Sequence, residues 1–110
     1  MQRRSQRVTL QVPVLVYGRA ADHSPYRDVS RTISVNQYGA LLDLRPGITR
    51  GQTILVVNGA TQEEHEAIAR YVGPKQYGRV KVGIEFTRPA PNFWRLCFPP
   101  LDPGAPAETS

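Results

Sequence analysis

The sequence predicts an all-β fold, a six-stranded antiparallel β-barrel that ends in a short helical turn. In most segments, apolar and polar residues alternate with the two-residue period of a strand. Gly, Pro and Asn stand between these segments in combinations typical of tight turns. The length of 110 residues suits one domain. Short strands joined by short turns favour an antiparallel barrel over a helical or α/β fold.

The first half of the chain supplies three predicted strands. The first covers residues 8–17, where Pro13 lacks a backbone donor and indicates an edge or a bulge. A loop over 18–26 precedes the second strand, over 28–35, and the tight connection 36–39 leads into the third, over 40–44. The alternation places on one face of the first strand Val8, Leu10, Val12, Val14 and Val16, and on one face of the second Val29, Arg31, Ile33 and Val35.

The second half of the chain supplies three more strands. After the turn signal Arg45-Pro46-Gly47, a strand over 52–57 ends at Asn58-Gly59, the strongest two-residue hairpin signal. Segment 62–72 contains good helix formers, yet its alternation also fits a strand, and the preceding hairpin favours the strand. The last strand, over 79–86, has the most regular alternation.

Beyond the strands, one helical turn is expected to close the barrel. Asn92 is the candidate N-cap, and Phe93, Leu96 and Cys97 would share one helix face. Two prolines follow, and the tail is rich in Pro and Ala, which predicts disorder. The predicted organisation is a flexible Arg-rich segment over 1–7, a barrel domain over 8–98 and a disordered tail over 99–110.

The charge balance indicates an anionic partner. The chain has 14 Lys and Arg against 9 Asp and Glu, a net charge of +5. Three of the arginines lie in the first seven residues, and the remainder of the chain has a net charge of +2. A surface for a nucleic acid polymer would spread its charge over the fold, so the concentration favours a compact anion.

Several function classes lose support from composition alone. Membrane insertion is not expected, because no apolar run approaches the roughly 20 residues that span a bilayer. The basic start lacks the apolar core of a signal peptide, so a cytoplasmic location is expected. The single cysteine and two distant histidines do not supply a metal site. No motif with a catalytic mechanism is present, so we expect neither an enzyme nor a cofactor.

The most informative local feature is the arginine segment before the first strand. Arg3 and Arg7 stand four residues apart, and Arg4 is an additional candidate. Each guanidinium is a planar fork that fits phosphate oxygens or the O6 and N7 atoms of guanine. The alternative is a basic start that only keeps the protein in solution.

Together with two later segments, this arginine pair resembles the PilZ domain family. The segments are Gly39-Ala-Leu-Leu in the third strand and Val82-Gly-Ile-Glu-Phe in the last. The resemblance covers residues 3 to about 98 and implies a PilZ-like, split-barrel type of six-stranded barrel. It also implies a receptor for the bacterial second messenger cyclic di-GMP, in which the arginines clamp guanines and phosphates. A second family motif, Asp or Asn, any residue, Ser, two residues and Gly, contacts a guanine.

The second motif is matched only in part. Gly39 fits its last position, but Asn36 stands where the family has Ser, and Ser34 where it has Asp or Asn. Counting from Thr32 instead leaves Gly39 two residues late. The small polar side chains can still bond a guanine edge, although an unmet guanine pair would cost about 1 to 3 kcal/mol. The alternatives are turn capping for Ser34 and Asn36 and a simple turn for Gly39.

Three function hypotheses follow. The first is a cyclic di-GMP receptor or adaptor that binds with Arg3, Arg7, Ser34, Asn36 and Gly39 and signals to a downstream protein partner. The second is a degenerate PilZ-like interaction module that does not bind the nucleotide. The third is a small basic barrel that binds RNA or single-stranded DNA, which the clustering of aromatic residues at turns disfavours.

Overall fold

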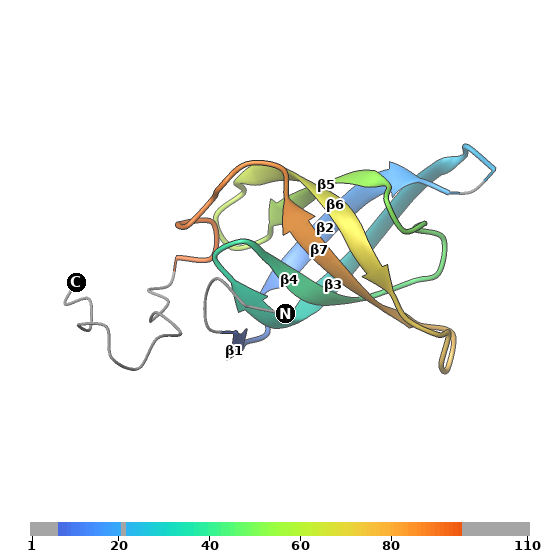
Figure 1. The fold of residues 1–110 in the computed structure, drawn as a ribbon, viewed down its shortest axis with the longest axis horizontal. Helices are drawn as coiled ribbons and strands as arrows, with labels where there is room; N and C mark the ends of the chain where they lie inside the picture. The colour runs from blue at the N-terminus through green and yellow to red at the C-terminus, as the bar shows by residue number, and fades with distance from the viewer. Residues whose placement is uncertain (1–6, 21, 96–110) are drawn as a thin grey trace.

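The computed structural model of the chain describes residues 7–20 and 22–95 and contains a closed antiparallel barrel (Figure 1). The sheet order is β1-β3-β2-β5-β6-β7-β4, and an additional β3–β4 pairing closes the barrel through the six longer strands. The strand bounds are β1 Val8–Thr9, β2 Pro13–Arg19, β3 Pro25–Asn36, β4 Gly39–Leu44, β5 Thr53–Asn58, β6 Glu64–Val72 and β7 Val80–Phe86. The predicted all-β barrel is confirmed.

The first predicted strand is divided into two by the interruption expected near Pro13. β1 and β2 both pair with β3, and residues 10–12 between them leave the regular ladder. The Thr32 hydroxyl of β3 replaces the lost bonds, because it accepts from the Val12 amide at 2.8 Å and donates to the Leu10 carbonyl. The two-residue β1 is therefore held against one side of β3 beside the barrel.

The ambiguous segment 62–72 forms β6, so the strand interpretation is confirmed. The Asn58-Gly59 signal does produce a β5–β6 hairpin, but its loop is longer than two residues. The Asn58 amide donates to the Glu63 carbonyl at 2.9 Å. Asn58 is also buried and its Nδ2 donates to the Phe93 carbonyl at 2.8 Å. This side chain therefore ties the C-terminal segment to the barrel.

The barrel interior is filled by aliphatic side chains and closed at one end by aromatic rings. The valines predicted on one face of the first strand lie in or against this core, which confirms that face. Phe86, Phe93 and Trp94 are buried, and the Phe93 and Trp94 centroids lie 4.8 Å apart with nearly perpendicular planes. At the other end the buried Tyr26 hydroxyl donates to the Arg45 carbonyl at 2.6 Å, and burial raises its pKa to about 12.

The predicted helical turn over 93–98 is wrong for the part that the structure describes. Residues 90–95 form consecutive turns, with bonds from the Phe93 amide to the Ala90 carbonyl and from the Arg95 amide to the Asn92 carbonyl. Arg95 has a φ of 60°, which a right-handed helix does not allow. Residues 91–95 still cover the barrel end as expected. Leu96, Cys97 and the tail lie outside the described residues.

Candidate ligand-binding face

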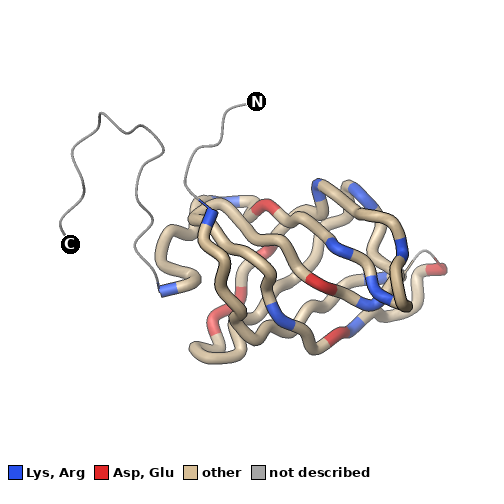
Figure 2. Tube along the Cα trace, turned by 90° about the horizontal axis from the view of Figure 1, so that it is seen from below, with Lys and Arg blue, Asp and Glu red and all other residues tan. Residues whose placement is uncertain are grey.

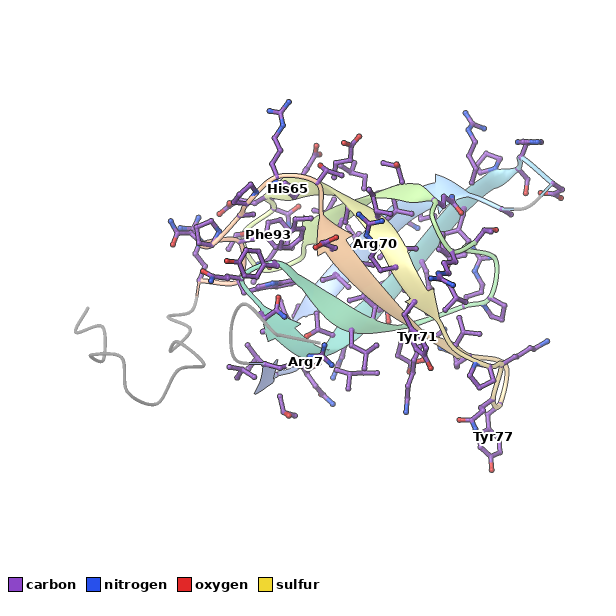
Figure 3. The ribbon with its side chains drawn as sticks, viewed as in Figure 1. Arg7, His65, Arg70, Tyr71, Tyr77 and Phe93 are labelled. Carbon is purple, nitrogen blue, oxygen red and sulfur yellow. The ribbon has the colours of Figure 1, made fainter. Side chains whose placement is uncertain are left out.

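The pairing of β1 with β3 brings Arg7, which directly precedes β1, toward the predicted site residues of β3. Thr9 lies opposite Ser34 and Val8 opposite Val35. Continued by one residue, this antiparallel register places Arg7 level with Asn36. Arg7 is exposed and makes no ion pair with a described carboxylate (Figure 3). Its guanidinium is therefore available to an anion at this end of the barrel.

Ser34 lies on the outer surface of β3 because a β-bulge reverses the alternation. Ser30 and Thr32 are buried on one side of the strand, the register shifts between Thr32 and Ser34, and Val35 then enters the core. Ser34 consequently faces away from the core, yet it is only 6 % exposed. Its hydroxyl makes no hydrogen bond to a residue within the described ranges. A buried, unused hydroxyl beside Arg7 can bond a polar ligand.

Asn36 has a local role in the turn that joins β3 and β4. It pairs with Gly39 across a connection of two residues, and its Oδ1 accepts from the Tyr38 amide at 2.8 Å. This is the turn capping expected as the alternative to a ligand contact. The side-chain Nδ2 remains available as a donor, since no described residue accepts from it.

Gly39 is required by packing between strands. A Cβ at this position would lie 1.9 Å from the Ile84 carbonyl oxygen of β7. The Gly39 carbonyl also accepts from Trp94 Nε1 at 3.1 Å. Its φ is not positive, so close approach of two backbones explains the glycine. This requirement holds whether or not a ligand binds nearby.

A continuous row of residues extends the face from β1 across four further strands. The pairing registers place side by side Thr9, Ser34, Leu41, Gly83 and Tyr71. Leu41 and Gly83 alternate with core residues of β4 and β7, so they face outward. Tyr71 is 54 % exposed. The row therefore combines a hydroxyl with an aromatic side chain, that of Tyr71, which lies against Gly83.

Comparison with solved structures identifies the fold of this barrel. The structure of the Bacillus subtilis inhibitor of motility MotI/DgrA, a PilZ-fold protein, superposes with a TM-score of 0.60 over 82 % of this chain, at 15 % identity. The chain spans 44 % of that protein's length. It has a PilZ-like barrel fold.

A second structure, the PilZ domain of CeSA from a cellulose-synthesizing bacterium, matches at a TM-score of 0.49. That match has 20 % identity and covers 76 % of this chain and 84 % of the other. No protein-family model and no curated protein matches the chain. The PilZ-like assignment made from sequence is confirmed at the level of fold.

In the PilZ-like barrel, the sequence reasoning located Arg7, Ser34, Asn36 and Gly39 in one region but missed Tyr71. Alternation places Tyr71 on the same face as Ala67 and Ala69, which are buried. A register shift between Ala69 and Tyr71 turns the tyrosine outward instead. The alternation predicted for the second strand fails for the same reason, since Val29 is exposed and Val35 is buried. A single-residue bulge leaves no clear signal in the sequence pattern.

Other chemistries find no support in the part of the PilZ-like barrel that is described. Its residues bring together no group of three or more His, Cys, Asp or Glu side chains that could hold a metal ion. Nor does any helix in that part have the length and apolar character needed to span a bilayer. Arg3 and Arg4, the other arginine candidates, lie outside the described residues.

Proposed function

We propose that the chain is a receptor or adaptor module that binds cyclic di-GMP on the face formed by β1, β3 and β4. One observation carries the proposal: the β1–β3 register, continued by one residue, brings Arg7 close to the Ser34 hydroxyl and the Asn36 amide, and among the described residues neither Arg7 nor the Ser34 hydroxyl has a polar partner. Cyclic di-GMP carries two phosphates and two guanines, which arginine recognises by charge-assisted bonds and by stacking. Arg3 would act as the second arginine of the clamp.

The remaining contacts that the dinucleotide needs come from the row of residues that crosses the strands, namely Thr9, Ser34, Leu41, Gly83 and Tyr71. A guanine could pack against the exposed ring of Tyr71, beside Leu41 and Gly83. Ser34 and the Nδ2 of Asn36 would bond its polar edge. Gly39 would keep the hairpin close to β7 and so hold these groups in place. Ordering of residues 1–7 around the ligand would change the surface offered to a partner protein.

The test is a calorimetric titration of the full chain with cyclic di-GMP, in wild type and in Arg7→Ala. Removing a charge-assisted bond costs about 1.5–3 kcal/mol, so affinity should fall roughly 10- to 150-fold. Arg50→Ala is the matched control, because Arg50 is also exposed but lies in the loop between β4 and β5. Added salt should weaken wild-type binding, since part of the attraction is to phosphate.

No binding by the wild type at micromolar protein, or equal loss in Arg7→Ala and Arg50→Ala, would contradict the proposal. Arg3→Ala tests the second arginine, and Ser34→Ala tests the hydroxyl with little change in volume. Cyclic di-AMP serves as the nucleotide control, because adenine lacks the O6 acceptor that arginine recognises.

The interaction module that binds no nucleotide is the second candidate. The capping role of Asn36 Oδ1 favours it, because that oxygen is already occupied by the Tyr38 amide. In that case wild type and Arg7→Ala would give no heat with cyclic di-GMP, and both would retain the same protein partners.

A further inference from the structure

The β6–β7 hairpin carries an aromatic residue at its tip that the fold does not use. The hairpin projects from the barrel body (Figure 1), and Tyr77 lies at the end remote from Arg7 and Phe93 (Figure 3). Gln76 and Arg79 pair across a two-residue turn, and the intervening Tyr77 is fully exposed (Figure 3). A large aromatic side chain wholly in water contributes no burial to the stability of the barrel.

The backbone conformation makes tyrosine a poor choice at this position. Tyr77 and Gly78 have φ values of 52° and 74°, which define a type I′ hairpin turn. Asn-Gly and Asp-Gly suit this turn, whereas a bulky residue at positive φ is an outlier. Both burial and local geometry therefore disfavour Tyr77, and a residue that breaks local rules without gain to the fold indicates function.

A groove lies at the base of the hairpin, next to the exposed tyrosines. Its volume is about 500 Å³. Apolar groups form much of its lining, together with polar groups on β4 and β7. The lining includes Ile33, Tyr71, Pro74, Tyr77, Val80 and Lys81. Exposed Tyr residues beside apolar pockets are typical anchors of protein interfaces.

The charges around this groove define the kind of partner. The hairpin arm carries Lys75, Arg79 and Lys81, and Arg79 is paired with Asp28 and Asp43, each at 3.5 Å. Lys75 and Lys81 are exposed and form no ion pair with a residue in the described part of the chain. Figure 2 shows several basic residues gathered at one end of the barrel. Two uncompensated cations thus flank the aromatic tip.

We propose that the Tyr77 hairpin and its groove dock an acidic, extended segment of a partner protein. Tyr77 and Tyr71 would provide the apolar anchors, and Lys75 and Lys81 would pair with carboxylates of the segment. A nucleic acid fits less well, because apolar groups form much of the groove lining, whereas binding to a phosphate backbone depends on several cations along its path. The docking surface shares Tyr71 with the proposed nucleotide site, but it extends from there to the hairpin tip and does not depend on Arg7.

The test selects binders from a random peptide library displayed on phage, with the full wild-type chain as bait. Selected peptides are synthesised, and their affinities are measured by fluorescence anisotropy against wild type, Tyr77→Asn and Lys75→Glu. We expect enrichment of peptides that contain Asp and Glu, and a loss of roughly tenfold or more in both variants. Val29→Thr is the control, because Val29 is an exposed apolar residue outside the groove.

The outcomes separate this surface from the nucleotide site. Arg7→Ala should keep full peptide affinity, and Tyr77→Asn should keep full affinity for cyclic di-GMP, so either site can fail alone. Selection of neutral or basic peptides, or equal affinity for wild type and Tyr77→Asn, overturns the proposal. Tighter binding of single-stranded oligothymidylate, lost in Tyr77→Asn, would assign the hairpin to nucleic acid and also overturn it. Circular dichroism checks that each variant is folded.

Discussion

Two hairpins of the barrel each reverse direction through a two-residue turn that contains a tyrosine, Gln37-Tyr38 between β3 and β4 and Tyr77-Gly78 between β6 and β7, yet they differ in almost every contact. The β3–β4 turn is packed against the rest of the molecule. Asn36 caps it, the Tyr38 carbonyl accepts from the Phe86 amide at 2.7 Å, and Trp94 bonds Gly39. At the β6–β7 turn, Tyr77 is fully exposed, and a Cβ on Gly78 would have no neighbour within 4 Å.

The difference shows how strongly the fold restricts the choice of residues in each of the two turns. In the β3–β4 turn, Asn36, Tyr38 and Gly39 each make a contact that the fold requires. A residue there that matches a ligand motif can therefore be explained by packing alone. In the β6–β7 turn, the fold requires only the reversal of direction and leaves the side chains free to serve another purpose. Stability measurements can test this contrast directly.

The largest effect is expected for Gly39→Ala. The new methyl group would overlap the Ile84 carbonyl, and such overpacking against backbone costs about 3 kcal/mol of the free energy of unfolding. Gly78→Ala is the matched control and should cost only about 1 kcal/mol, through its positive φ. Urea denaturation measures both. If both variants lost the same free energy of unfolding, the proposed contrast between the two turns would be wrong.

An intermediate effect is expected for Asn36→Ala. Loss of the cap on the Tyr38 amide should lower the free energy of unfolding by about 1 kcal/mol. Asn36→Asp keeps the acceptor oxygen and should keep most of the stability while losing the Nδ2 donor. If Asn36→Asp binds cyclic di-GMP as tightly as wild type, the amide has no part in recognition.

The smallest effect, and one of opposite sign, is expected for Tyr77→Asn. Asparagine adopts positive φ more readily than tyrosine, so the free energy of unfolding should stay constant or rise by up to about 1 kcal/mol. Thermal denaturation followed by circular dichroism measures it. A clear loss of stability would show that Tyr77 serves the fold, which the exposure of its side chain argues against.

The strands and their order along the chain could be predicted from the sequence. Which side chains of each strand point into the core could not be predicted along its whole length. Alternation correctly placed Val12, Val14 and Val16 in the core. It failed where the ladders shift between Thr32 and Ser34 and between Ala69 and Tyr71. Each shift depends on pairing between strands distant in sequence, which a single sequence does not display.

The same limit applies to the candidate site. Arg7 and Ser34 could be singled out by residue type and motif, but their proximity depends on a two-residue strand that local pattern alone does not separate from β2. The neighbouring Tyr71 comes from another part of the chain and joins the row only through closure of the barrel.

The bond between Trp94 and the Gly39 carbonyl has a practical consequence. Trp94 is the only tryptophan in the chain, and its buried indole contacts the hairpin that begins at Asn36. Indole emission shifts in wavelength when its hydrogen bonding or burial changes. The intrinsic fluorescence spectrum of the unlabelled protein is therefore an optical reporter of the barrel end where Trp94 meets this hairpin, Phe86 and Phe93, and it requires no attached dye.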